Sequence, residues 1–300
     1  MKINIVGAGR VGQTLGKLLV DTRVVHVGSI YNRTRLNAEK SAAFIGEGTP
    51  ITDLTDMEQA DLYMVTTADG ALGEVCDRML NVHNFKQGSV IFHCSGVTPS
   101  SLFKRAQEHG CYIASVHPVK SFADPSIAVL DFKGTFCAVE GDEKALGILE
   151  ECFQRIGGQI IRINTEKKAL YHGATVMACN NLVALIEAAT SMYVDSGLDR
   201  QSALKLMEPI IRGTITNIFA LGSVSALTGP IARGDSETVK KHLDALKYDD
   251  GMLSDVYCSL GKWALSLSKE QGSATTESLE NIQIYLNQNN RFNKKINFQL

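Results

Sequence analysis

The stretch Lys2-Ile3-Asn4-Ile5-Val6-Gly7-Ala8-Gly9-Arg10-Val11-Gly12 decides the fold of this chain. Residues 2–6 alternate in polarity and are rich in β-branched side chains, which predicts a strand. Three glycines follow at G-x-G-x-x-G spacing, and leucines then recur at helical spacing. A strand, a glycine turn and a helix in this order predict a binding site for the pyrophosphate of a dinucleotide.

Each glycine of this turn has its own expected role. Gly7 allows the tight turn, Gly9 lets the pyrophosphate approach the backbone, and Gly12 lets the helix pack closely on the strand. Arg10 and Val11 lie in the first helical turn, where free amides and the positive end of the helix dipole face the phosphates. The alternative is a structural glycine turn that binds no ligand.

Composition narrows the class of protein. The 300 residues are sufficient for two domains, and 44% apolar with 21% charged residues is ordinary for a soluble protein. A net charge of −2 gives no reason to expect nucleic acid or an anionic membrane as a partner. No continuous apolar run reaches the roughly 18 residues of a membrane span, and a strand starting at residue 2 leaves no room for a signal peptide. Seven cysteines without a C-x-x-C pair indicate reduced thiols in a cytoplasm.

Strand-like and helical patterns alternate up to about Asn164 and then change. The further runs that predict strands are residues 24–31, 61–67, 88–94, 111–116, 135–139 and 159–163. This alternation predicts an α/β fold with a doubly wound, mainly parallel sheet over residues 1–164. Only helical patterns follow, so residues 165–288 form an expected all-α domain. Residues 289–300, rich in Asn, Gln and Lys, form an expected flexible tail.

The end of the second predicted strand decides which dinucleotide binds. NAD-binding proteins place an acidic residue about 20 positions beyond the glycines, where it binds the ribose 2′-hydroxyl. Here Asn32, Arg33 and Thr34 occupy that place. A carboxylate would repel a 2′-phosphate, whereas the planar guanidinium of Arg33 can donate to it. We therefore expect NADP(H); the alternative for Arg33 is a solvated loop arginine.

Two further turns follow predicted strands. Thr66, Thr67 and Ala68 follow one strand, and Ser95 and Gly96 follow the next. Ligands of open α/β sheets bind at the carboxyl ends of the strands, so we expect both turns to contact the cofactor. Thr98 or Ser100 is expected to cap the helix that comes next.

These motifs resemble the 6-phosphogluconate dehydrogenase-like superfamily, and within it the group of Rossmann-like proteins with a DUF2520 C-terminal domain. The resemblance rests on Gly7–Gly12, His93–Gly96, His117–Phe122, Tyr171-His172 with Asn180, and Gly229–Asp235. Some members of the group are similar to an alternative ketopantoate reductase of pantothenate synthesis, and the group also resembles pyrroline-5-carboxylate reductases and prephenate dehydrogenases. The resemblance implies a two-domain NADP-dependent reductase, and superfamily analogy implies a homodimer.

The long helix of the second region holds the expected proton donor. Related β-hydroxyacid dehydrogenases carry a lysine about one turn before an Asn, but Met177 stands at that position before Asn180. His172, two turns before Asn180 and on the same face as Lys168, is the expected acid instead. Asn180 would orient the substrate carbonyl. The alternatives are a hydrogen-bonded strut for His172 and a polar core contact for Asn180.

His117 comes at the end of a predicted strand and precedes Pro118. Prephenate dehydrogenases are similar in carrying His-Pro at a strand end near the substrate, which makes His117 a candidate catalytic residue and Ser121 a candidate substrate ligand. The alternatives are a loop histidine bonded to backbone and, for Lys120 nearby, a solvated side chain.

The turn Gly229–Asp235 carries one cation, Arg233, which suits bidentate binding of a carboxylate. The alternatives are a salt bridge from Arg233 to Asp235 or to another subunit, and an N-cap role for Asp235. Asn217 is a weaker candidate of the same kind. No cluster of His, Cys, Asp and Glu has metal-ligand spacing, so we expect no metal.

Taken together, these features predict a cytoplasmic NADPH-dependent reductase of a small 2-keto acid, with 2-dehydropantoate as the expected substrate. Two alternatives stay open: an NADP-linked reductase of an imine such as pyrroline-5-carboxylate, and a non-catalytic protein that senses NADPH.

Overall fold

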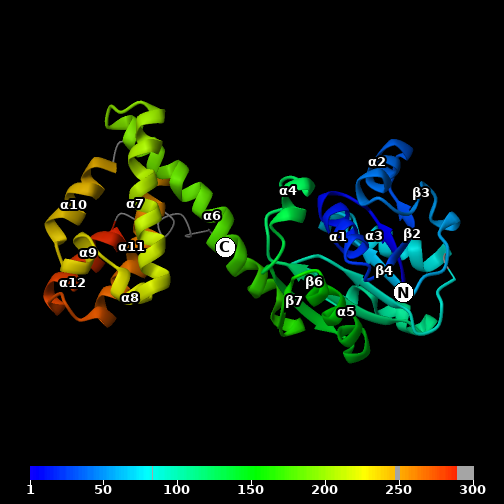
Figure 1. The fold of residues 1–300 in the computed structure, drawn as a ribbon. Coiled ribbons are helices and arrows are strands. Elements are labelled where there is room, and N and C mark those ends of the chain that lie inside the picture. Colours follow the sequence, from blue (N-terminus) through cyan, green and yellow to red (C-terminus); the bar gives the residue numbers. More distant parts are fainter. Residues whose placement is uncertain (83, 247–250, 289–300) are drawn as a thin grey trace, which may run out of the picture. The chain divides into compact units, whose positions relative to one another are not determined.

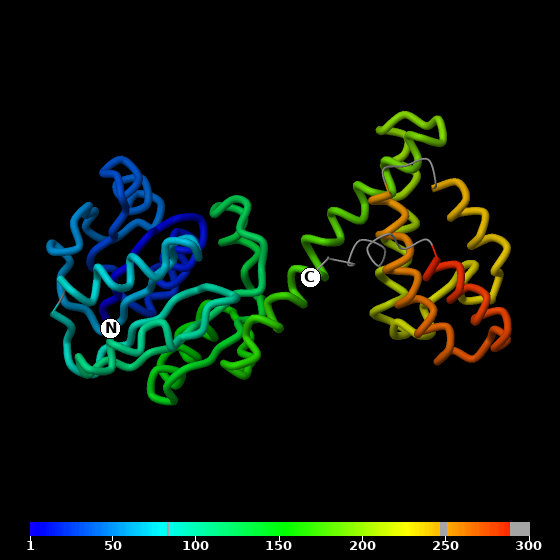
Figure 2. The backbone as a smooth tube through the Cα atoms, turned by 180° about the vertical axis from the view of Figure 1, so that it is seen from behind, coloured from blue at the N-terminus to red at the C-terminus, as the bar shows by residue number. Residues whose placement is uncertain are grey.

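The computed structural model describes residues 1–82, 84–246 and 251–288 of the chain. It divides into two compact units, Met1–Asn181 and Leu182–Leu300 (Figures 1 and 2). The expected flexible tail, residues 289–300, lies outside the described residues.

An eight-stranded sheet forms the centre of the first unit, in the order β3-β2-β1-β4-β5-β6-β7-β8. The strands are β1 (Lys2–Val6), β2 (His26–Tyr31), β3 (Thr49–Ile51), β4 (Leu62–Val65), β5 (Val90–His93), β6 (Tyr112–Pro118), β7 (Phe136–Gly141) and β8 (Gln159–Arg162). Every neighbouring pair is parallel except β6 and β7, which pair antiparallel. This confirms the mainly parallel α/β class. Strand order reverses beside β1, so a crevice opens at the carboxyl ends of β1 and β4.

Helices cover both faces of this sheet. They are α1 (Arg10–Asp21), α2 (Arg35–Ile45), α3 (Asp69–Val82), α4 (Pro125–Leu130) and α5 (Glu143–Arg155), with 3-10 turns η1 (Leu54–Asp56), η2 (Ser100–His109) and η3 (Thr165–Lys167). One apolar core joins α1 and α5 to the sheet through residues such as Leu15 and Phe153. The other core joins α3 and η2 to the opposite face through Met79 and Phe103. The apolar side chains recur at helical spacing, so each helix buries one stripe against the strands.

The second unit is built from helices in its described part, as the sequence predicts. The long helix α6 (Lys168–Asp195) is followed by α7 (Arg200–Leu221), α8 (Ser223–Ala226), α9 (Pro230–Arg233), α10 (Ser236–Ala245), α11 (Met252–Gln271) and α12 (Thr276–Gln288). Buried side chains such as Val239, Cys258 and Ile282 join α10, α11 and α12 into one core. Asp235 caps α10 by accepting a hydrogen bond from the Thr238 amide at 3.0 Å, which confirms its expected capping role.

By length and composition alone, one described helix, Thr165–Asp195, could cross a membrane; its mean hydropathy is 1.3. The sequence contains no continuous apolar run of that length because His172, Asn180 and Asn181 interrupt this helix. Its start is also tied into the first unit by Lys168, whose ammonium is 1% exposed and pairs with Glu140. The apolar window of this helix is 0% buried in the structure, and one such helix is weak evidence for a membrane.

Candidate active site

A cavity of about 740 Å³ opens at the carboxyl ends of β1, β2 and β4. The predicted cofactor residues that line it are Gly7, Gly9, Arg10, Asn32, Arg33, Thr34, Thr66, Thr67 and Ala68. Asn37 and Lys40 of α2 also line it, and the sequence reasoning missed both. Their spacing from Thr34 could have identified them, because residues 34, 37 and 40 lie on one face of a helix.

The glycine turn has the geometry that its spacing predicts. Gly7 has φ +80°, and an added Cβ there would collide with the methyl group of Thr67. A Cβ at Gly12 would collide with Oγ1 of Thr66, because α1 and the strands pack closely there. A Cβ at Gly9 would have its nearest neighbour at 3.9 Å, so the backbone beside Gly9 is open to a ligand. The three roles therefore separate as expected for a dinucleotide turn.

Two buried polar atoms on this cavity have no partner among the described residues: Oδ1 of Asn32 and Oγ1 of Thr67. The side-chain nitrogen of Asn32, Nδ2, already has a partner, because it donates to the carbonyl of Ala8 at 3.3 Å. Buried polar groups are nearly always hydrogen-bonded, so unpaired atoms on a cavity wall indicate a ligand with complementary groups. Together with the open backbone at Gly9, they fit a bound dinucleotide.

The basic side chains near α2 differ in whether they form an ion pair and in whether they line the cavity. Arg35 is held by Glu39 at 2.7 Å and does not line the cavity. Arg33 and Lys40 line it, and the described residues supply neither with an ion pair. The hydroxyl of Thr34 accepts from the Asn37 amide at 3.4 Å, so Thr34 caps α2. Two uncompensated cations at this position favour an anionic ligand group.

A second cavity, of about 430 Å³, shares Thr66, Thr67 and Ala68 with the first. Its other walls include Val11, Ser95, Gly96, His117 and His172, all of which the sequence reasoning singled out. The remaining lining residues are Asp69, Cys94, Pro118, Lys120 and Phe122. A ligand that fills the first cavity can therefore reach the second along the turn after β4.

The other predicted substrate and catalytic residues do not line this second cavity. Ser121 is exposed between Lys120 and Phe122, which do line it, and Asn180 is an exposed residue of α6. Asn217 and Arg233 are exposed residues of α7 and α9 in the second unit.

His117 and His172 meet at Gly96. Their ring centres are 5.8 Å apart, and a Cβ at Gly96 would collide with Cδ2 of His172 and lie 2.9 Å from Nε2 of His117. Nδ1 of His117 forms a hydrogen bond of 3.0 Å with the Tyr171 hydroxyl. Burial, aided by the charges of His172 and Lys168, lowers the pKa of His117 to about 4. His117 is therefore neutral near pH 7.

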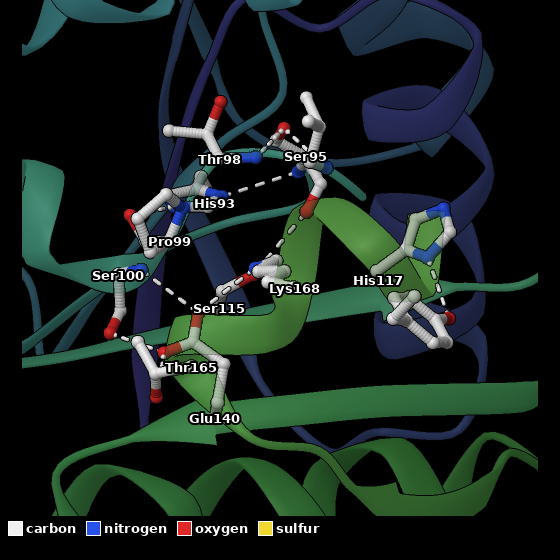
Figure 3. Close-up of polar contacts among 12 residues, drawn as sticks. His93, Ser95, Thr98, Pro99, Ser100, Ser115, His117, Glu140, Thr165 and Lys168 are labelled. Carbon is white, nitrogen blue, oxygen red and sulfur yellow. Dashed lines mark hydrogen bonds and ion pairs between the residues drawn. The ribbon is translucent and has the colours of Figure 1, made fainter. Parts of the chain in front are cut away.

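The turn that carries Ser95 is held by His93 (Figure 3). Nδ1 of His93 accepts from the Ser95 amide at 3.2 Å, and Nε2 donates to the Pro99 carbonyl at 3.3 Å. Burial, and secondarily Lys168, lowers the pKa of His93 to about 4, which suits this neutral tautomer. The hydroxyl of Ser95 accepts from the Thr98 amide at 3.0 Å. These bonds leave the turn little freedom.

A buried ion pair lies beneath this turn. Nζ of Lys168 is 2.9 Å from Oε1 of Glu140, and both side chains are at most 2% exposed. Glu140 also accepts from the amide of Ser100 at 2.8 Å and from its hydroxyl at 2.7 Å. The expected cap by Thr98 or Ser100 is therefore wrong: a carboxylate from distant β7 binds the start of η2.

Gly96→Ala should disrupt the second cavity because the new methyl group would collide with both histidine rings. We expect a loss of roughly 1–3 kcal/mol in the free energy of unfolding, the usual range for overpacking. The control is Gly73→Ala on α3, where a Cβ meets nothing within 4 Å. Urea unfolding of both variants checks this, and equal stabilities would contradict the contact.

Two family models match the chain over different ranges from these two units. Residues 1–118 match the Rossmann-like domain and residues 135–263 match a domain of unknown function, DUF2520. The chain is a Rossmann-like protein with a DUF2520 domain. No curated protein matches the sequence.

Solved structures of similar fold span nearly the whole chain. TM1727 from Thermotoga maritima is 27% identical with a TM-score of 0.71, covering 90% of this chain and 99% of its own. BF3122 from Bacteroides fragilis, a candidate NADP oxidoreductase, is 22% identical with a TM-score of 0.66, covering 90% and 97%. An imine reductase from Streptomyces aurantiacus is 14% identical with a TM-score of 0.58, covering 96% and 94%. The last two show similarity of fold alone.

Proposed function

We propose that this chain is a cytoplasmic NADPH-dependent reductase of a small 2-keto acid, with 2-dehydropantoate as the first substrate to test. The observation that carries the proposal is the pair of cavities joined at Thr66–Ala68. One cavity has the glycine turn and free cations that suit NADPH, and the other has two histidines beside the joining turn. The relation of fold to an NADP oxidoreductase and an imine reductase supports a reductase.

The residues of the first cavity would hold NADPH along its length. The backbone beside Gly9 and the N-terminus of α1 would bind the pyrophosphate, and Arg33 with Lys40 would bind the 2′-phosphate. Thr67 and Asn32 would gain partners for their unpaired oxygens. When bound, the nicotinamide supplies the hydride that reduces the carbonyl carbon.

The residues of the second cavity would handle the proton. If the Tyr171 hydroxyl donates to Nδ1 of His117, the proton of the neutral ring lies on Nε2, beside Gly96. That N–H can orient the substrate carbonyl, while the His172 ring delivers the proton to the carbonyl oxygen. Lys120, only 16% exposed and 2.8 Å from Asp131, also lines this cavity and would attract the carboxylate.

Two other functions would use the same cavities. An imine substrate also needs a proton donor, so a reductase of a cyclic imine acid is the second candidate. A protein that binds NADPH without turnover is the third, because Met177 replaces the lysine expected from related dehydrogenases. NADPH oxidation with a panel of keto acids and imine acids separates the three.

Arg33→Ala should weaken NADPH binding by about 1–3 kcal/mol, the range for losing a hydrogen bond to a charged group, and leave NADH binding nearly unchanged. The matched control is Arg35→Ala, since Arg35 pairs with Glu39 and does not line the cavity. Fluorescence titration of both reduced cofactors provides the test. If the wild-type protein binds NADH as tightly as NADPH, the proposed specificity is wrong.

We also propose that a second copy of this chain covers α7. Seven large apolar side chains of this helix are exposed: Leu204, Leu206, Ile210, Ile215, Ile218, Phe219 and Leu221. The largest apolar patch of an ordinary monomer covers roughly 300–600 Å². One aromatic side chain buries about 150–250 Å², and Phe219 is 88% exposed. A homodimer would remove this surface from water.

Light scattering after gel filtration should therefore give the wild-type protein the mass of a dimer, and Phe219→Asp the mass of a monomer at the same concentration. Ile284→Asp on α12 is the control, because Ile284 is also exposed but lies off α7. A monomeric wild-type protein would overturn this proposal.

A further inference from the structure

A chain of buried hydrogen bonds runs from β7 to the wall of the second cavity (Figure 3). Glu140 on β7 pairs with Nζ of Lys168, the first residue of α6. The same ammonium donates to the hydroxyl of Ser115 on β6. That hydroxyl in turn donates to the carbonyl of Ser95 at 3.5 Å. One ammonium thus joins two strands, one helix and the cavity-lining turn.

Two hydrogen bonds attach the start of α6 to β7. Glu140 accepts from Thr165 in η3 at 3.0 Å as well as from Lys168, so the segment that leads into α6 is attached at two points. Tyr171 and His172 lie within the next turn of the helix. A rotation of α6 about its axis would withdraw both from His117, because residues one turn apart share a face.

We propose that Lys168 is a positioning residue of the candidate active site. Its ammonium fixes Ser95 through Ser115 and fixes the start of α6 through Glu140, and so keeps Gly96, His117 and His172 together at the cavity. This inference rests on the proposed function only where it calls the second cavity an active site. The positioning itself can be measured in the protein without substrate.

The charge of Lys168 also acts on the histidines. Lys168 and His172 on α6 both lower the pKa of His117, beyond the larger effect of burial, and Asp69 at the start of α3 opposes them. Lys120 from the segment after β6, Cys94 after β5, and Tyr171 are further titratable groups at this cavity. Removing the ammonium should therefore let His117 accept a proton more readily.

The test variant is Lys168→Met with Glu140→Gln, which removes both charges and leaves no buried ion unpaired. Histidine pKa values are measured by NMR titration of the ring signals. We expect the pKa of His117 to rise above about 4 by the part that Lys168 contributes, while burial, the larger cause, remains. Signals of Ser95, Gly96 and His172 should shift as well. The control is Lys86→Met with Asp61→Asn, an ion pair of 2.6 Å at the opposite, amino end of β4.

A second variant, Ser115→Ala, cuts the link to Ser95 but keeps the ion pair, so it serves if the double variant does not fold. Its control is Ser89→Ala, another buried serine, at the amino end of β5. Ser115→Ala should shift the Ser95 and Gly96 amide signals, while Ser89→Ala should leave them in place.

Unchanged signals and an unchanged His117 pKa would overturn the positioning role and reduce Lys168 to a structural ion pair. Both readouts are independent of turnover, so a failure to find a substrate would count against the proposed function alone. Where turnover is found, the double variant should lower kcat at least about tenfold, in the range of misplaced catalytic groups.

Discussion

His172→Ala should lower kcat by about 10²–10⁴-fold, the usual contribution of a general acid. His172 lines the second cavity, its ring is 5.8 Å from that of His117, and its Cδ2 faces Gly96. Because burial holds the pKa of His117 near 4, His117 is neutral near pH 7, and we assign proton delivery to His172.

The alternative role for His172 is a structural strut, and it predicts the reverse pattern. A strut would lower the melting temperature of His172→Ala while the folded fraction kept its kcat. His26→Ala is a suitable control because the His26 side chain is 82% exposed and forms a hydrogen bond with Glu47 at the surface. Normal turnover in a less stable His172→Ala protein would refute the catalytic role.

Lys168→Met should lower the free energy of unfolding by about 3–5 kcal/mol, because it leaves the buried carboxylate of Glu140 without its counter-ion. Burial raises the pKa of this carboxyl, but Lys168 and Ser100 outweigh that effect and hold the pKa below its ordinary value. Adding Glu140→Gln should recover most of the loss, since no buried charge is then left unpaired. Urea unfolding of the single and double variants measures both effects.

The pH dependence of this loss has a definite sign. A carboxyl whose pKa is lowered on folding stabilises the protein above the pKa of the unfolded chain, here the ordinary 4.5, and loses that contribution as the pH falls. The difference between the wild-type protein and Lys168→Met should therefore narrow as the pH falls, beginning above pH 4.5, because burial raises the pKa of Glu140 once Lys168 is absent, and ending below pH 4.5. Lys17→Met, which breaks an exposed pair with Asp21, should cost at most about 1 kcal/mol. An equally small effect for Lys168→Met would contradict the buried ion pair.

The dinucleotide turn could be predicted from sequence because its determinants are local. Strand β1, the glycine turn and α1 occupy 20 consecutive positions, from Lys2 to Asp21. Both the backbone conformations that glycine allows and the spacing of apolar residues can be read from these 20 positions. The change from alternating to purely helical patterns near Asn164 is equally local.

The Lys168–Glu140 pair could not be predicted in the same way. The two residues are 28 positions apart, and they meet only because β7 runs antiparallel to β6 and places Glu140 opposite Ser115. Nothing in the local pattern shows that a lysine at the start of an apolar helix is buried. The expected capping of η2 was wrong for the same reason, because its partner is this distant carboxylate.

The second cavity was predicted in part. Ser95 and Gly96 follow β5 and His117 lies at the end of β6, and the carboxyl ends of these strands meet at one edge, so the sheet topology implies their proximity. Ser121 is exposed while its neighbours Lys120 and Phe122 line the cavity. Neighbouring residues of a loop can point in different directions, and the loop sequence alone does not show which of them faces the cavity.

The most direct measurement of the central claim is the oxidation of NADPH by the purified wild-type protein in the presence of 2-dehydropantoate, other small 2-keto acids and cyclic imine acids. We predict oxidation that depends on a 2-keto acid, is fastest with 2-dehydropantoate and is lost in His172→Ala. Tight NADPH binding without oxidation by any of these compounds would contradict the assignment as a reductase.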